Sequence, residues 1–392
     1  MKLVKRLILL LAVLPALLLV TSCGETPRRE VTSVLVYLAG NNSLESYGPD
    51  CLSQLKSGFI PEDKADADIL LVYYHVPGEA PTLKKISKTT SGLIKELVLC
   101  SYPSFQNSAT PATLAKVIAD AEAICPADHH SLVMWSHSTG FLPNGYYDKL
   151  WYGDADLFSS AKPRSGERRT FGRDYGSDEE IEITDLANVL PFKYEVILFD
   201  SCLMGGVEVA YELKDKCEYL VVSPTEIMAK GFPYYIMMEE LLNNKDKAAA
   251  ATVIAKEYYD YYNAQHGGGT VTVVNTSGLG SLAQITSRII SNHRSEISAL
   301  NRNTLQYYDR CRAHWTYDLD DIISRVATAS EYSTFQSALS ASTVYKAATP
   351  TFLSIPINKY SGYGVYLPYP EYKNLNAFYK TLAWNKATGL VE

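Results

Sequence analysis

The sequence predicts an α/β fold in which a mostly parallel central sheet is flanked by helices and followed by a mainly helical C-terminal subdomain. Over residues 31–275, short apolar runs typical of buried strands alternate with amphipathic segments typical of helices. That order implies parallel pairing with right-handed crossovers. Beyond residue 276 the helical pattern predominates, at 279–300, 318–327 and 333–341.

Each predicted strand is an apolar run that ends in a turn signal. The runs lie at 34–39, 68–75, 131–136, 196–199, 219–222 and 270–274. Residues 82–100 alternate around Gly92 as a hairpin does. Thr110 and Pro111 suit the start of a helix, and Ser43 suits the cap of a helix after the first strand. Further helices are predicted at 207–213, 236–242 and 248–263.

The first 22 residues have the pattern of a lipoprotein signal peptide. Basic residues at 2, 5 and 6 precede an apolar run over 7–20, which is too short for a membrane span. Small residues before Cys23 resemble a bacterial lipobox, which predicts cleavage and lipidation at Cys23 and a tether over 23–30. The expected location is the bacterial cell envelope, with the chain anchored in the outer or plasma membrane. The alternative is an ordinary secretory peptide with a chance cysteine.

Composition bounds the classes of function. The net charge is −7, and about −10 once the signal peptide is removed, so no basic stripe is available for nucleic acid. Seven cysteines are widely spaced without a C-x-x-C pair, which indicates neither a zinc site nor a dense disulfide framework. The domains expected are a catalytic domain over 31–275, with an insertion at 141–182, and a subdomain over 276–392 packed on it. The chain is expected to be monomeric.

Two strand tips carry residues suited to nucleophilic catalysis. Cys202 follows the strand at 196–199, and His137 follows the strand at 131–136. Carboxyl ends of parallel strands meet at one edge of a sheet, so both side chains are expected there. A thiolate that attacks a carbonyl needs a base and oxyanion donors. We expect the donors to be the N–H of Cys202 and one in the turn from Ser138 to Gly140.

No third residue is obvious as a partner that would orient His137, so the sequence predicts a Cys/His dyad. A buried structural cysteine is the alternative interpretation of Cys202. A serine hydrolase is poorly supported because no G-x-S-x-G motif is present.

These motifs resemble those of the clostripain family of cysteine peptidases, which have a caspase-like fold. The resemblance covers roughly residues 31–385. It rests on the segments at 37–44, 134–137 (Met-Trp-Ser-His), 199–204 (Phe-Asp-Ser-Cys-Leu-Met), 223–234, 318–319 and 364–369. It implies a sheet of about nine strands, with Cys202 as nucleophile and His137 as general base and acid. It also implies peptide or protein substrates cleaved after Arg or Lys, with Asp200 at the floor of the S1 pocket.

The sequence departs from the family pattern in the loop at 223–234. Lys230 stands where an acidic residue is expected to line S1, and it would repel a basic P1 residue or pair with Asp200. Glu226 is the candidate to compensate. The P1 preference therefore stays open. A catalytically weak or inactive surface lipoprotein that binds peptides or a host protein is the alternative function.

Two more properties of relatives bear on this chain. Several mature by self-cleavage in the insertion, where Lys149, Arg164, Arg168 and Arg169 are candidate processing sites; a merely solvated loop is the alternative. Some depend on calcium. No D-x-D-x-D-G loop is present, so a calcium site would have to be assembled from scattered oxygens. No other cofactor is expected.

Four tyrosines in the helix at 248–263 suit packing or a recognition surface; they are Tyr258, Tyr259, Tyr261 and Tyr262.

Overall fold

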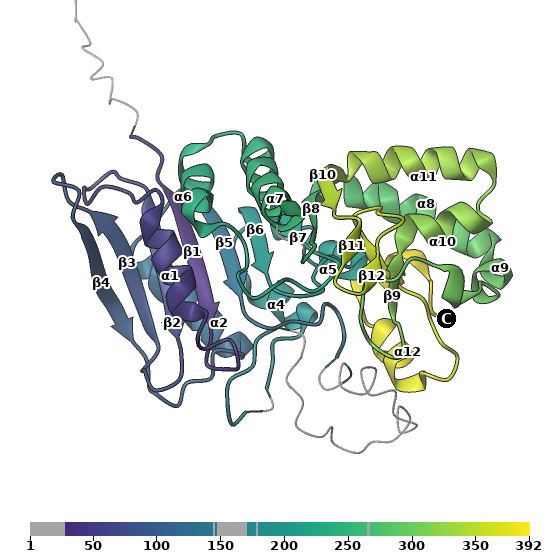
Figure 1. Cartoon of the computed structure of the whole chain (residues 1–392), viewed down its shortest axis with the longest axis horizontal. Helices are drawn as coiled ribbons and strands as arrows, with labels where there is room; N and C mark the ends of the chain where they lie inside the picture. Colours follow the sequence, from purple (N-terminus) through teal and green to yellow (C-terminus); the bar gives the residue numbers. More distant parts are fainter. Residues whose placement is uncertain (1–27, 144–145, 147–170, 178, 265–266) are drawn as a thin grey trace, which may run out of the picture.

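A nine-stranded mixed sheet forms the centre of the molecule (Figure 1). The computed structural model describes residues 28–143, 146, 171–177, 179–264 and 267–392. The strand order is β10-β8-β7-β6-β5-β1-β2-β3-β4. The strands are β1 (Thr32–Ala39), β2 (Ile69–His75), β3 (Thr82–Lys88), β4 (Ile94–Ser101), β5 (His129–Trp135), β6 (Tyr194–Asp200), β7 (Cys217–Val222), β8 (Thr270–Asn275) and β10 (Thr343–Ala348).

The middle of the sheet is parallel, as the alternation of strands and helices predicted. Strands β2, β1, β5, β6 and β7 pair in parallel. The two edges are antiparallel: β3 and β4 form the predicted hairpin on one side, and β8 and β10 close the other. The parallel centre brings the carboxyl ends of β5 and β6 to the same edge of the sheet.

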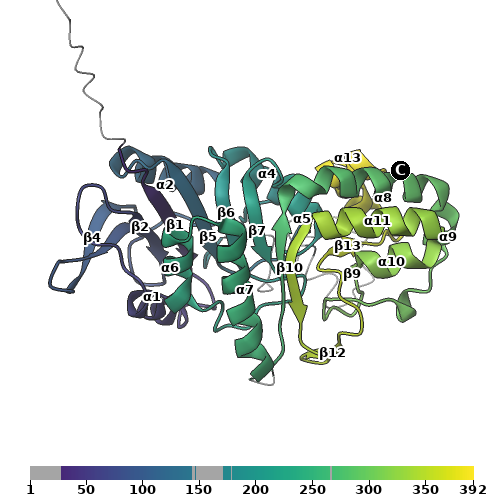
Figure 2. The ribbon, with the colours of Figure 1, turned by 90° about the horizontal axis from the view of Figure 1, so that it is seen from above.

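Helices cover both faces of the sheet (Figure 2). Helices α1 (Gly48–Ser57), α6 (Tyr234–Asn243) and α7 (Lys247–Ala264) lie on one face, and α2 (Pro111–Ile124), α4 (Ile183–Val189) and α5 (Val207–Glu212) on the other. Both faces are apolar because successive side chains of a strand point to opposite sides. In β1, Leu35 and Tyr37 join the core under α2, whereas Val34 and Val36 join the core under α1 and α6.

The C-terminal region packs against the end of the sheet and also extends it (Figure 1). Strand β10 comes from this region and pairs with β8, so the expected boundary near residue 275 is crossed by a sheet strand. The C-terminal region also contains two two-stranded antiparallel ribbons. They are β9 (Thr316–Asp318) with β13 (Gly364–Tyr366), and β11 (Thr351–Phe352) with β12 (Ile355–Pro356). Its helices are α8 (Leu279–Asn292), α9 (Arg294–Ser298), α10 (Leu319–Val326), α11 (Ala329–Ala341), α12 (Lys373–Tyr379) and α13 (Ala383–Thr388).

A buried carboxylate joins this region to the turn after β6. Glu208 at the start of α5 accepts hydrogen bonds from the Tyr366 backbone N–H at 2.8 Å and the Tyr379 hydroxyl at 2.7 Å. The Gly364 N–H also donates to the Gly205 carbonyl. Burial raises the pKa of Glu208 to about 7.

We expect Glu208→Gln to remove a pH dependence of stability. Between pH 4.5 and about 7 the folded chain holds a proton on Glu208 that the unfolded chain releases. The free energy of unfolding therefore falls as pH rises through that interval, by about 3 kcal/mol at most. Urea unfolding at pH 5 and pH 8 measures it. Exposed Glu239→Gln is the matched control, and an unchanged pH slope in Glu208→Gln would contradict the expectation.

Within the described ranges, no helix is long and apolar enough to cross a membrane.

Candidate active site

Strand register places the two candidate catalytic side chains side by side. Trp135 in β5 pairs with Asp200 in β6, and His137 and Cys202 each lie two positions further along. Both line one cavity of about 290 Å³. Its other lining residues are Leu44, Trp135, Ser136, Asp200, Ser201, Glu226, Ile227, Met228, Ala229, Gly231, Arg310, Phe352 and Leu353. The cavity therefore joins the two strand tips, the loop after β7 and two segments of the C-terminal region.

The turn after β6 holds Cys202 in a constrained backbone. Leu203 has a φ of 63°, a left-handed conformation that is uncommon for a residue other than glycine. The N–H of Leu203 donates to the Thr225 carbonyl at 2.9 Å. The N–H of Ile227 points at Cys202 Sγ at 3.3 Å. The Cys202 thiol in turn donates to the Ile227 carbonyl at 3.7 Å, so both polar groups of Ile227 hold the sulfur in place.

His137 has a partner that the sequence did not reveal. Ser43 Oγ lies 2.8 Å from Nε2 of His137. The prediction that Ser43 caps a helix was wrong, because α1 begins at Gly48 and its N-terminus carries no side-chain cap. The turn after β1 instead directs the hydroxyl at the imidazole. The spacing of 94 residues between the two gave no signal of this contact.

The last part of the insertion, from residue 171, packs next to His137. The Gly172 N–H donates to the His137 carbonyl at 2.9 Å, and residues 138 and 171 form a β-bridge. Asp174 anchors this segment in the interior, where its Oδ2 accepts from the Ser108 N–H at 2.7 Å and lies 3.2 Å from His75 Nδ1. The candidate processing sites Lys149, Arg164, Arg168 and Arg169 lie outside the described residues, as does Cys23.

Asp200 is buried yet reaches the cavity. Its Oδ2 accepts a hydrogen bond from the Tyr234 hydroxyl at 2.9 Å. Its Oδ1 has no hydrogen-bond partner in the part of the chain that the structure describes. Burial raises the pKa of this carboxyl to about 7. Gly231 crosses directly over the carboxylate with a φ of +65°, and a Cβ there would lie 2.3 Å from Oδ2, so only glycine fits.

Lys230 and Glu226, both expected to line the S1 pocket with Asp200, lie in different cavities. Lys230 is absent from the catalytic cavity; its ammonium lies 6.0 Å from the ring of Tyr261, in an adjoining cavity. It therefore neither pairs with Asp200 nor fills the space beside it. Glu226 does line the catalytic cavity, where it forms an ion pair with Arg310. Arg310 was missed because it lies in an irregular stretch without a motif.

Ser138 and Gly140, the residues expected to supply an oxyanion donor, are both buried and do not line the catalytic cavity. The Ser138 hydroxyl donates to the Cys202 carbonyl and so ties the two strand tips together. Gly140 packs against the Leu203 carbonyl, where an added Cβ would lie 2.6 Å from the oxygen. Their role in oxyanion binding stays a prediction.

Metal chemistry has no ready site among the residues described. No group of three or more His, Cys, Asp or Glu side chains there could hold a metal ion. The calcium dependence implied by the resemblance stays a prediction.

Comparison with known proteins assigns the chain to a family. The sequence profile of the clostripain family matches residues 36–387. The chain belongs to the clostripain family. It is therefore a cysteine protease, and the predicted fold and peptidase class are confirmed. No curated protein matches the chain in a sequence search.

Solved structures of C11 proteases have a fold similar to that of this chain. An inactive zymogen C11 protease from Parabacteroides distasonis is 32% identical, with a TM-score of 0.77 over 92% of this chain and 99% of that one. A secreted C11 cysteine protease from Bacteroides thetaiotaomicron, bound to an irreversible peptide inhibitor, is 24% identical. Its TM-score is 0.76 over 92% of this chain and 99% of that one, and at this identity it supports the fold alone.

Proposed function

We propose that this clostripain-family protease is an exported, lipid-anchored endopeptidase that cleaves after Arg or Lys through a Cys202/His137 dyad. One observation carries the proposal. Cys202, His137 and a buried carboxylate, Asp200, line the same cavity, and one oxygen of that carboxylate has no partner among the residues described.

The dyad would act in two steps, acylation of Cys202 and hydrolysis of the acyl-enzyme. The Cys202 thiolate attacks the scissile carbonyl carbon, and the tetrahedral intermediate collapses as protonated His137 gives its proton to the leaving amine. The C–N bond breaks and a thioester acyl-enzyme remains. Neutral His137 then takes a proton from water, whose hydroxide attacks the thioester. The acid product leaves and the thiolate is restored.

A basic P1 side chain suits the charge at Asp200. Oδ1 lies beneath Gly231, so a guanidinium or ammonium would reach it only if the Gly231 segment shifts. The charge-assisted hydrogen bond formed there would offset the cost of desolvating both groups. The other acidic group in the cavity, Glu226, is paired with Arg310 and is thus less available. Since Lys230 faces the adjoining cavity, it does not oppose a cation at Asp200.

The remaining parts of the proposal concern location and maturation. The lipobox-like segment supports lipidation at Cys23 and attachment of a monomer to the envelope membrane. The contacts of residues 171–175 support processing within the insertion, at Lys149, Arg164, Arg168 or Arg169. Residues 171–175, in the last part of the insertion, are hydrogen-bonded to the backbone of His137 and anchored by Asp174. A cut upstream would therefore change the surroundings of the catalytic histidine.

A positional-scanning peptide library tests the proposed specificity. We expect the mature chain to prefer Arg or Lys at P1 by at least tenfold in kcat/KM over norleucine, which has a similar length without charge. A peptide chloromethylketone ending in Lys is expected to label Cys202 and spare Cys51 and Cys217, which are free but buried. Equal hydrolysis of the norleucine and lysine peptides would contradict the P1 assignment.

A further inference from the structure

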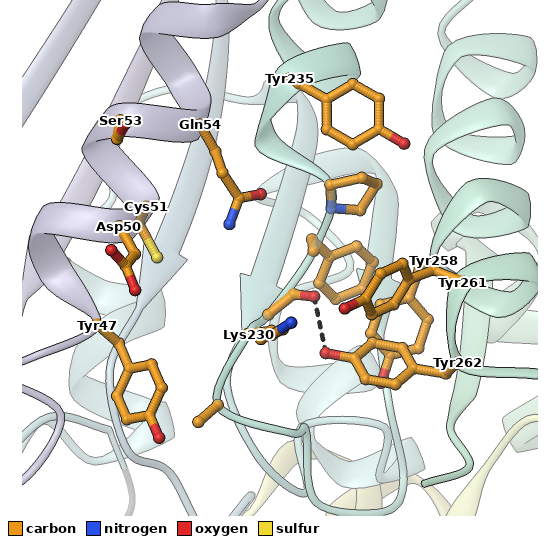
Figure 3. Close-up of a pocket in the computed structure, with 14 residues that line it drawn as sticks. Tyr47, Asp50, Cys51, Ser53, Gln54, Lys230, Tyr235, Tyr258, Tyr261 and Tyr262 are labelled. Carbon is orange, nitrogen blue, oxygen red and sulfur yellow. Dashed lines mark hydrogen bonds between the residues drawn. The ribbon is translucent and has the colours of Figure 1, made fainter. Parts of the chain in front are cut away.

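A second cavity of about 420 Å³ borders the catalytic cavity. The two cavities share Ala229 and Gly231 in their linings. Helix α1 forms one wall, α7 forms the opposite wall, and the loop that leads into α6 lies between them (Figure 3). Tyrosines dominate this lining, and we call it the tyrosine cavity; they are Tyr47, Tyr235, Tyr258, Tyr261 and Tyr262.

The chemistry of the tyrosine cavity suits a large apolar or aromatic side chain. Tyr235 and Tyr261 are 47% and 37% exposed, so their rings are available to a ligand. Asp50 on α1 and Lys230 on the loop place opposite charges on two walls, which leaves no excess charge to select an ion. At the buried base, desolvation raises the pKa of Cys51, so its thiol is neutral. Aromatic walls of this kind favour stacking with another ring.

Packing holds the wall between the cavities in place. The Tyr262 hydroxyl donates to the Gly231 carbonyl at 3.1 Å (Figure 3). Phe232 stacks on Tyr258 with 4.3 Å between ring centroids. The same loop carries the Ile227 N–H that reaches Cys202 Sγ. When the scissile carbonyl of a peptide lies at Cys202, another residue of that peptide, a few positions away, therefore lies next to the tyrosine cavity.

We propose that the tyrosine cavity is a second side-chain subsite, which takes a large aromatic or aliphatic residue of the same peptide that is cleaved at Cys202. This inference rests on the proposed peptidase function. It gives Lys230 and Tyr261 a role in selecting a residue other than P1. Three tyrosines of α7 line the subsite: Tyr258 and Tyr262 are buried, and Tyr261 is partly exposed.

Substitution at the rim of the cavity tests the inference. Ser53 is an exposed lining residue of α1, so Ser53→Trp should fill the cavity without disturbing the core. Ser57, exposed on the same helix but outside the lining, gives the matched control Ser57→Trp. With P1 fixed, a library should show one other position where Phe, Trp or Leu exceeds Gly by at least tenfold in kcat/KM. Ser53→Trp should abolish that preference and Ser57→Trp should keep it.

A binding measurement separates this inference from the proposed catalysis. In a Cys202→Ala background, fluorescence anisotropy with the selected peptide and its Gly variant should show at least tenfold tighter binding of the aromatic peptide. That difference should disappear in Ser53→Trp and shrink in Tyr261→Ala. Absence of any aromatic preference in both measurements, or a preference that survives Ser53→Trp, overturns the subsite. Selective binding without hydrolysis by the unmodified chain would overturn only the catalytic proposal.

Discussion

Replacing Cys202 by Ala is expected to lower kcat/KM for peptide hydrolysis by about 10⁴-fold or more, because the covalent route is lost. The thiol sits at the tip of β6 beside His137, and no other cysteine lines the catalytic cavity among the residues described. Hydrolysis of a fluorogenic peptide by the purified mature chain measures the loss. Retained activity would remove Cys202 from the role of nucleophile.

A matched substitution separates chemistry from folding in this experiment. Cys217 is free and fully buried on β7, so Cys217→Ala should cost some stability but keep the rate per folded molecule. His137→Ala should lower kcat about as much as Cys202→Ala does, because residues that act as a unit are not additive. The double variant should then be no worse than either single one. An additive loss would show that the two residues act separately.

Replacing Asp200 by Asn should remove the preference for a basic P1 residue. Breaking a buried charge pair costs about 2–5 kcal/mol, so kcat/KM for an Arg or Lys peptide should fall by about 30-fold or more. The norleucine peptide should change little. Asp215→Asn, on an exposed carboxylate, is the matched control. An unchanged preference for Arg over norleucine would show that another group recognises P1.

Titration of Asp200 should make the preference for a basic P1 residue depend on pH. Burial raises the pKa of Asp200 to about 7, so the carboxyl is mostly neutral below that pH and charged above it. For an Arg peptide, kcat/KM should rise with pH through about 7 as the carboxylate forms in the free enzyme. Titration of the dyad affects the norleucine peptide equally, so the ratio of the two rates isolates Asp200. In Asp200→Asn that ratio should be independent of pH.

The sequence by itself determined the frame of the site. Apolar runs that end in turn signals located β1, β2, β5, β6, β7 and β8 to within a few residues. Their alternation with helices predicted parallel pairing, and parallel pairing brings strand tips to one edge whatever their separation in sequence. The proximity of His137 and Cys202 follows from that rule together with the pairing of β5 and β6 as neighbours.

Only the tertiary structure decided which side chains surround this pair. Ser43 meets His137 across 94 residues, and Arg310 meets Glu226 across 84. Such contacts depend on the direction in which each loop leaves its strand. Loops have no periodic pattern of apolar residues from which that direction could be predicted. Lys230 shows most clearly why the sequence could not place a loop side chain. Gly231 bends the chain over Asp200 in a left-handed conformation, and its neighbour Lys230 lies in the tyrosine cavity. The conformation of one backbone turn thus decided which of the two cavities contains the Lys230 ammonium group.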